Sequence, residues 1–161
     1  SNIMNKTYNF ETSNLVSDGK SVYFSNNKNE LYSVDFKTGT PNWINNLNSS
    51  LTPIVIDDLI FTISHEGFLF VIQKNQGNII RINDVYKDLS LKKRKKVFPI
   101  GFKVGNNNLY LTSNNNVVTK IELESGIILK NQKISGSVLS EPFIYNESLY
   151  IVKNGSIIQY E

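Results

Sequence analysis

The chain has 161 residues and a formal net charge of +3, which is enough length for one substantial hydrophobic core. It contains no cysteine, which excludes a disulfide framework, a haem-attachment motif and a cysteine zinc site. No run of about eighteen apolar residues occurs, so no segment reads as a transmembrane helix.

The apolar residues fall in short alternating segments that are separated by clusters of Gly, Asn, Asp and Ser. Alternation with period two, interrupted by turn residues, is typical of antiparallel strands. The apolar residues are mainly Ile, Val, Leu, Phe and Tyr, and alanine is absent. The sequence therefore predicts an all-β protein.

These segments repeat four times along the chain. Each copy starts with an apolar triplet, continues through a polar turn into an alternating strand, and in the first three copies reaches a glycine: Gly39, Gly77 or Gly126. The triplets are Val22-Tyr23-Phe24, Ile60-Phe61-Thr62, Leu109-Tyr110-Leu111 and Leu149-Tyr150-Ile151.

Three of the copies are preceded by a proline that opens a further apolar stretch, at Pro53, Pro99 and Pro142. Proline suits the first residue of a strand, where its missing N–H costs no ladder bond. Each unit then contains four strands: one after the proline, one at the triplet, one after the polar turn and one after the glycine. A small twisted sheet cannot bury both faces alone, so the copies are predicted to stack face to face as blades of a β-propeller. A β-sandwich is the alternative.

The segment "ELYSVDFKTGTPNW", residues 30–43, resembles the repeat of the pyrroloquinoline-quinone (PQQ) propeller family. In that family the tryptophan of the repeat docks one blade on the next, which implies a structural docking role for Trp43 together with Gly39, Gly77 and Gly126. Arg81 and Lys130 stand at the corresponding position of the later copies, and the junctions without tryptophan are expected to close through other apolar contacts.

Four blades are about half of the ring that is usual for this family. The predicted blades are residues 12–50, 51–87, 97–138 and 139–161, with 6–11 as an extra outer strand. Two chains could close an eight-bladed ring, so a homodimer is a further prediction.

One segment lies outside the repeat, in the long interval between the second and third units. Residues 88–96 are predicted to form a basic loop between blades, and five consecutive cations in it account for more than the whole net charge: Lys92, Lys93, Arg94, Lys95 and Lys96. Such a run could bind an acidic protein partner or an anionic lipid surface, or it could be a solvated connection. No aromatic residue is interleaved with the cations, which argues against nucleic acid.

Neither catalysis nor a metal site is predicted. His65, the sole histidine, has Glu66 beside it, but nucleophilic catalysis needs a third oriented group. Asp57 and Asp58 are interpreted as turn residues rather than calcium ligands. The carboxylates, Asn and paired cysteines that hold PQQ and calcium in enzymes of this family are not reproduced, so no cofactor is expected.

The short blades and the terminal "LYIVKNGSIIQYE" resemble the non-enzymatic BamB-type lipoproteins of outer-membrane barrel assembly. The resemblance implies a protein-interaction scaffold at the periplasmic face of the outer membrane, with its signal and lipid anchor outside this sequence, and a subunit of the barrel-assembly machinery as partner. Two alternatives remain: a fragment of a PQQ-dependent dehydrogenase, and a ligand-sensing propeller domain of a larger receptor.

Overall fold

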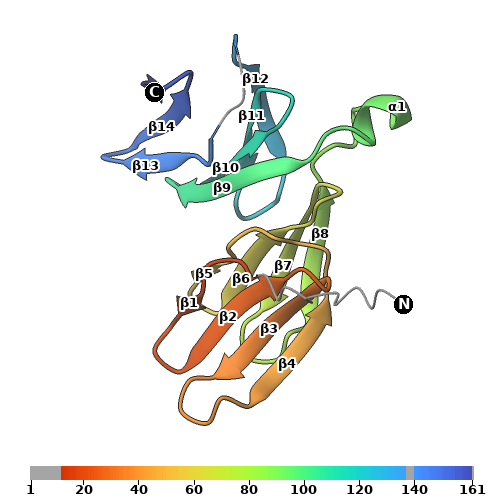
Figure 1. The fold of residues 1–161 in the computed structure, drawn as a ribbon, viewed down its shortest axis with the longest axis vertical. Coiled ribbons are helices and arrows are strands. Elements are labelled where there is room, and N and C mark those ends of the chain that lie inside the picture. Colours follow the sequence, from red (N-terminus) through yellow and green to blue (C-terminus); the bar gives the residue numbers. More distant parts are fainter. Residues whose placement is uncertain (1–11, 137–139, 161) are drawn as a thin grey trace, which may run out of the picture.

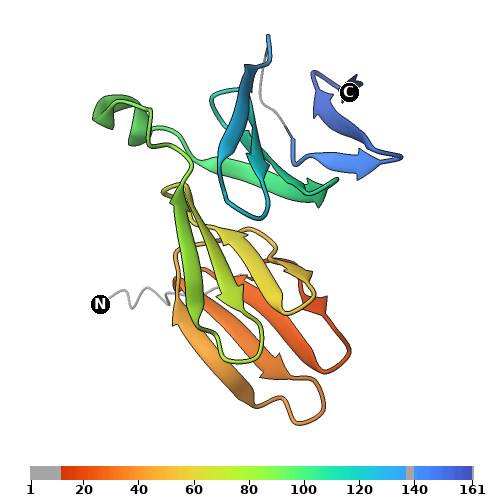
Figure 2. The ribbon, with the colours of Figure 1, turned by 180° about the vertical axis from the view of Figure 1, so that it is seen from behind.

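A computed structural model of the chain describes residues 12–136 and 140–160, which form four antiparallel sheets and one short helix (Figures 1 and 2). We number the sheets as blades 1 to 4. Blade 1 consists of β1 (Val16–Ser17), β2 (Ser21–Asn26), β3 (Glu30–Asp35) and β4 (Pro41–Asn46). Blade 2 consists of β5 (Ile54–Ile56), β6 (Leu59–Ile63), β7 (Phe68–Gln73) and β8 (Ile79–Asp84). Blade 3 consists of β9 (Pro99–Gly105), β10 (Asn108–Ser113), β11 (Val117–Glu122) and β12 (Ile128–Lys133). Blade 4 consists of β13 (Phe143–Tyr145), β14 (Ser148–Lys153) and β15 (Ser156–Tyr160).

Strands in each blade pair in sequence order, as the repeat predicts. The predicted all-β class and the propeller-type blades are confirmed, and the four sheets do not close into a ring. The division of the chain at residues 50, 87 and 138 stays a proposal, and the extra strand predicted at residues 6–11 lies outside the described residues.

The turns explain why the sequence is rich in Asn and Gly. Asn29 and Asn116 occupy the turn before the third strand of blades 1 and 3, with φ of 64° and 63°. Gly39, Gly77 and Gly126 occupy the turn before the fourth strand, with φ of 71°, 73° and 74°. Positive φ is accessible to Gly and is tolerated by Asn better than by most residues. The same backbone conformation at the same position identifies these turns as copies of one unit.

Alternation along the strands places successive side chains on opposite faces, and each face packs on a different neighbour. In blade 2, Ile60 belongs to the core shared with blade 1, whereas Phe61 belongs to the core shared with blade 3. Blade 3 repeats this arrangement, because Leu109 faces blade 2 while Tyr110 lies on the side of blade 4. The hydrophobic core is therefore divided among three junctions between blades, and each junction depends on both of its sheets.

Candidate interaction surfaces

The basic segment contains a helical turn where a loop was predicted. Helix α1 (Leu91–Arg94) follows Ser90, whose carbonyl accepts hydrogen bonds from the backbone N–H groups of Lys93 and Arg94 at 2.9 Å. Leu, Lys and Arg are good helix formers, which explains the local departure from an all-β chain. The helix projects from the side of the molecule, between blades 2 and 3 (Figure 1).

Arg94 is turned inward and fastens this helix to blade 2. Its guanidinium forms an ion pair with Asp84 at the end of β8 and lies 5.0 Å from the ring centroid of Phe68. Both partners of the ion pair are largely covered, with 24% and 28% of their side chains exposed. Arg94 therefore acts as an anchor, which distinguishes it from the four lysines in the same candidate partner-binding segment.

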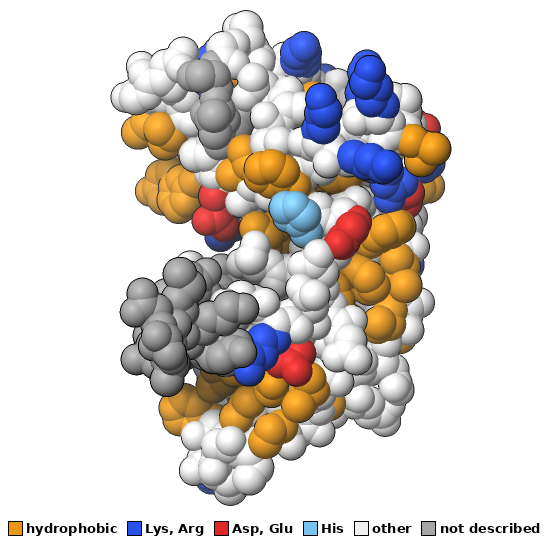
Figure 3. Space-filling model, turned by 45° about the vertical axis from the view of Figure 1, so that its right-hand side comes forward, with side chains coloured by type: hydrophobic (Ala, Val, Ile, Leu, Met, Phe, Trp, Pro, Cys, Tyr) orange, Lys and Arg blue, Asp and Glu red, His pale blue; other side chains and the backbone are white. Residues whose placement is uncertain are grey.

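Those four lysines, by contrast, face solvent. Lys92, Lys93, Lys95 and Lys96 are exposed, and within the described part of the chain no ion pair is formed by their ammonium groups. Figure 3 shows basic side chains gathered on this side of the molecule. The four lysines remain the candidate partner-binding residues of this segment.

His65 is an exposed turn residue next to the basic segment. Its ring stacks on Phe98 with centroids 5.1 Å apart and an interplanar angle of 16°. The neighbouring Glu66 instead accepts a hydrogen bond of 2.6 Å from Asn48. Burial tends to raise the pKa of Glu66, but the Asn48 amide and other hydrogen bonds outweigh it and leave the pKa lowered. The two side chains thus serve different partners and do not form the oriented pair that acid–base chemistry requires.

Trp43 connects blade 1 to blade 2. Its indole Nε1 donates to the carbonyl of Lys74 at 2.9 Å, and Asn45, two residues along β4, donates to the carbonyl of Gly77 at 2.8 Å. A Cβ atom built on Gly77 would lie 2.7 Å from Trp43 Cδ2. The tryptophan of blade 1 therefore packs directly on the glycine turn of blade 2.

Arg81 makes the corresponding contact between blades 2 and 3. It occupies the position of Trp43 in the repeat, and its Nη2 donates to the carbonyl of Leu123 at 2.7 Å. Asn83 corresponds to Asn45 in the repeat and donates a longer hydrogen bond of 3.5 Å to the carbonyl of Ser125. A Cβ atom built on Gly126 would overlap the Asn83 amide. Desolvation lowers the pKa of Arg81, as expected for a cation packed between sheets. This junction was expected to close through apolar contacts other than tryptophan. It has an apolar core and, in addition, the hydrogen bonds of Arg81 and Asn83.

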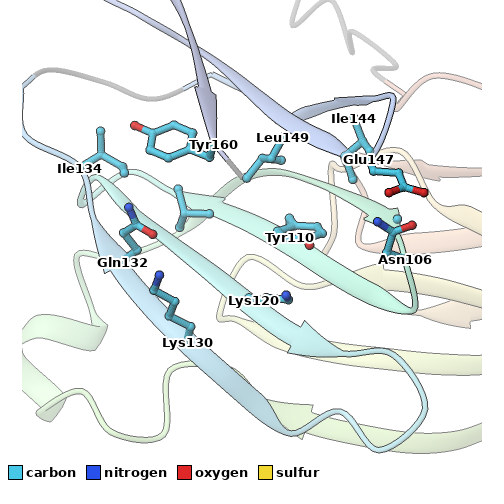
Figure 4. Close-up of a pocket in the computed structure, with 12 residues that line it drawn as sticks. Asn106, Tyr110, Lys120, Lys130, Gln132, Ile134, Ile144, Glu147, Leu149 and Tyr160 are labelled. Atoms are coloured by element: carbon cyan, nitrogen blue, oxygen red, sulfur yellow. The ribbon is translucent and has the colours of Figure 1, made fainter.

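Blades 3 and 4 enclose a cleft at the third junction. Figure 4 shows side chains of blade 3, including Lys120, Lys130 and Gln132, facing Leu149 and Tyr160 of blade 4. The cavity has a volume of about 120 Å³, below the roughly 300–1,000 Å³ that is usual for small-molecule sites. Lys130 occupies the same position of the repeat as Trp43 and Arg81. Among residues 12–136 and 140–160, its ammonium group has no hydrogen-bond acceptor. Gly39 of blade 1 has open space at the position where Gly77 and Gly126 meet a side chain of the preceding blade.

The outer face of blade 4 is apolar and uncovered by described residues. Its exposed side chains come from all three strands of the blade: Phe143 (60%), Tyr145 (60%), Val152 (48%) and Ile157 (73%). They point away from Leu149 and Ile151, which face blade 3. A contiguous apolar face of this kind is typical of a surface that another sheet or a partner covers.

The glycine turns and Trp43 are evident in the sequence, whereas the polar contacts between blades were not predicted from it. Asn45, Arg81 and Asn83 reach acceptors more than thirty residues away along the chain. The signal that could have found them is their equal spacing in the repeat, with Asn two residues after Trp43 and after Arg81.

In the described ranges no group of three His, Cys, Asp or Glu side chains is placed to hold a metal. Nor does any described helix have the length and apolar character needed to cross a bilayer.

The stacked antiparallel sheets, three with four described strands and one with three, define a β-propeller repeat protein. A profile of the family described as "Outer membrane protein assembly factor BamB" matches residues 5–83, which confirms the predicted resemblance to PQQ-like repeats of the BamB type. No curated protein sequence matches the chain significantly.

Solved propellers share the fold. BamB from Moraxella catarrhalis aligns with a TM-score of 0.71 and 16% identity, over 91% of this chain and 41% of that one. The computationally designed Ika4 protein aligns with a TM-score of 0.74 and 10% identity, over 96% of this chain and 93% of that one. The WD40 β-propeller domain of Doa1 aligns with a TM-score of 0.71 and 10% identity, over 92% and 49%. The chain therefore spans about two-fifths of the BamB structure and about half of the WD40 domain.

Proposed function

We propose that this chain is a non-catalytic protein-interaction scaffold that assists the assembly of outer-membrane β-barrel proteins as a BamB-like subunit. The observation that carries the proposal is the match of residues 5–83 to the BamB family profile. The structural similarity to BamB over 91% of the chain supports the same reading at the level of the fold. In this proposal the chain works at the periplasmic face of the outer membrane, and its partner is a subunit of the barrel-assembly machinery.

The partner can be tested directly by affinity purification of the full-length protein from detergent-solubilised outer membranes. We expect the barrel-inserting subunit to copurify in stoichiometric amounts and to be identified by mass spectrometry. Deletion of the gene should lower the amount of folded β-barrel proteins in the outer membrane. Normal barrel levels together with no copurifying assembly subunit would overturn the proposal.

We also propose that the apolar face of blade 4 packs on a sheet of a second copy, so that two sets of four blades share one ring. The face presents Phe143, Tyr145 and Ile157, each at least 60% exposed. Burying such side chains contributes about 1.5–3 kcal/mol each. Light scattering of the purified chain should give twice its mass of 18.3 kDa. The double substitution Phe143→Ser with Ile157→Ser should give the monomer mass, and a monomeric unaltered chain would exclude this arrangement.

A further inference from the structure

A small projecting surface, the basic knob, is formed by α1 and the two residues that follow it. It consists of Leu91, Lys92, Lys93, Lys95 and Lys96, all of them exposed. The knob stands out from the body of the molecule between blades 2 and 3 (Figure 1). It lies outside the repeat, so neither blade stacking nor the strand ladders require these residue types.

The knob is held in a fixed position at its base. Arg94 points the opposite way from the lysines, to Asp84 and the Phe68 ring of blade 2. Val97 is buried directly after the knob, and the carbonyl of Lys96 accepts a hydrogen bond of 2.9 Å from Asn114 of blade 3. The cations are therefore presented by a segment that both neighbouring blades anchor.

Leu91 gives the knob an apolar tip. At 80% exposure it is the most exposed large hydrophobic side chain of the described residues, and it belongs to none of their hydrophobic core clusters. An apolar side chain surrounded by cations is the composition of segments that lie at a membrane interface, where the apolar group enters the acyl boundary and the cations meet anionic headgroups. We propose that the basic knob docks on an anionic lipid surface.

Two observations favour lipid over an acidic protein. Lysine is depleted in protein interfaces, where arginine is enriched, and here the single arginine of the segment is the residue that turns inward. The cations that face outward are four lysines, which are flexible point charges suited to a fluid layer of phosphates rather than to bidentate recognition. The nearby aromatic rings, those of His65 and Phe98, stack on each other instead of offering a platform for bases.

Each lysine near an anionic surface contributes on the order of fivefold in affinity at moderate salt. Four of them should therefore give about 100-fold or more, and this part should disappear near 1 M salt because the Debye length falls to about 3 Å. Insertion of the Leu91 side chain should add about tenfold, with little dependence on salt.

The test is cosedimentation of the purified chain with vesicles of neutral phosphatidylcholine, with and without phosphatidylglycerol, at low and high salt. We expect binding only to the anionic vesicles, a loss of about 100-fold or more when Lys92, Lys93, Lys95 and Lys96 are all replaced by Gln, and a loss of about tenfold for Leu91→Ser. A matched control replaces four exposed lysines outside the knob, which removes the same charge: Lys20, Lys28, Lys37 and Lys130.

The control should bind nearly as well as the unaltered chain. Equal losses in the knob variant and in the control would overturn the proposal, because they would show a general charge effect. Absence of binding to anionic vesicles would also overturn it; if the knob variant then failed to copurify the assembly subunit, the knob would be a protein contact. The vesicles contain no protein, so this result is independent of the role in barrel assembly.

Discussion

The indole of Trp43 lies over Gly77 of the next blade, so close that a Cβ atom on that glycine would come within 2.7 Å of the ring. The same indole donates its N–H to the carbonyl of Lys74, three residues earlier in the same turn. The contact joins the fourth strand of one sheet to a turn of the next. The stacking of blade 1 on blade 2 therefore depends on two residues from different repeats, the Trp43 ring and the glycine at position 77.

Replacement of Gly77 by Ala should destabilise the chain by two separate effects. A residue with a Cβ pays about 1 kcal/mol at the positive φ of this turn, and displacement of the Trp43 ring adds about 2 kcal/mol. Gly39→Ala is the matched control, because its φ of 71° is nearly the same and nothing lies within 4 Å of the added Cβ. Urea unfolding should therefore show a loss of about 1 kcal/mol for Gly39→Ala and about 3 kcal/mol for Gly77→Ala.

A double-mutant cycle checks that the ring causes the difference. In a Trp43→Ala background the extra cost of Gly77→Ala should vanish, since the added methyl group then has space. If the two glycine variants were equally destabilised with Trp43 present, Gly77 would be a turn residue only.

Arg81 should stabilise the second junction through its hydrogen bond to blade 3. Its removal by Arg81→Ala leaves the carbonyl of Leu123 without this donor inside a largely covered contact, which costs about 1–3 kcal/mol. Lys130→Ala is the control at the same position of the next repeat, because this lysine is exposed. It should change the free energy of unfolding by less than about 0.5 kcal/mol. Equal effects of the two substitutions would show that the hydrogen bond of Arg81 to Leu123 does not stabilise the junction.

Much of the fold could be predicted because strand alternation and turn residues are local signals. The triplets, the prolines and the glycines at 39, 77 and 126 indicate stacked four-stranded sheets before any contact is known. The partner of Arg81 could not be predicted, because Leu123 contributes a backbone carbonyl, which carries no sequence signal.

The role of Arg94 in the basic segment could not be predicted from the sequence either. Its charge is evident in the sequence, but five consecutive cations give no indication that one of them is an anchor. Arg94 differs from its neighbours only because the fold brings Asp84 and Phe68 within its reach. The helical turn was missed for a related reason, since four residues are too few to establish a helical period.

Asp18 should make the first junction sensitive to acid. Burial tends to raise its pKa, but this is outweighed by hydrogen bonds from the backbone N–H groups of Ser21 and Lys20, from the Lys74 ammonium at 3.2 Å and from the Tyr23 hydroxyl, so the pKa is strongly lowered. A lowered pKa in the folded state stabilises the fold above the unfolded-state value near 4, and this contribution is lost as the pH falls toward the folded-state pKa.

The variant Asp18→Asn tests this sign. It should be less stable than the unaltered chain at pH 7, and the difference in the free energy of unfolding should shrink steadily as the pH is lowered from about 5 to 2. Urea titrations across this range measure it. A difference that stays constant would show that Asp18 contributes through neutral hydrogen bonds alone.

Tyr86 should make the second junction sensitive to alkali. The side chain is 5% exposed, its hydroxyl lies 2.8 Å from the Oγ of Ser113 in blade 3, and burial raises its pKa to about 12. Between about pH 10 and 12 the unfolded chain releases this proton while the folded chain keeps it, so stability is complete below pH 10 and falls as the pH rises toward 12.

The loss at Tyr86 should reach roughly 2–3 kcal/mol at pH 12. Tyr86→Phe removes the ionisable group and the bond to Ser113 together. We expect this variant to lose about 1 kcal/mol at pH 7 and to show a shallower decline above pH 10, so that the two stability curves converge and cross. Parallel curves for the two proteins would mean that Tyr86 ionises in the folded chain as readily as in the unfolded chain.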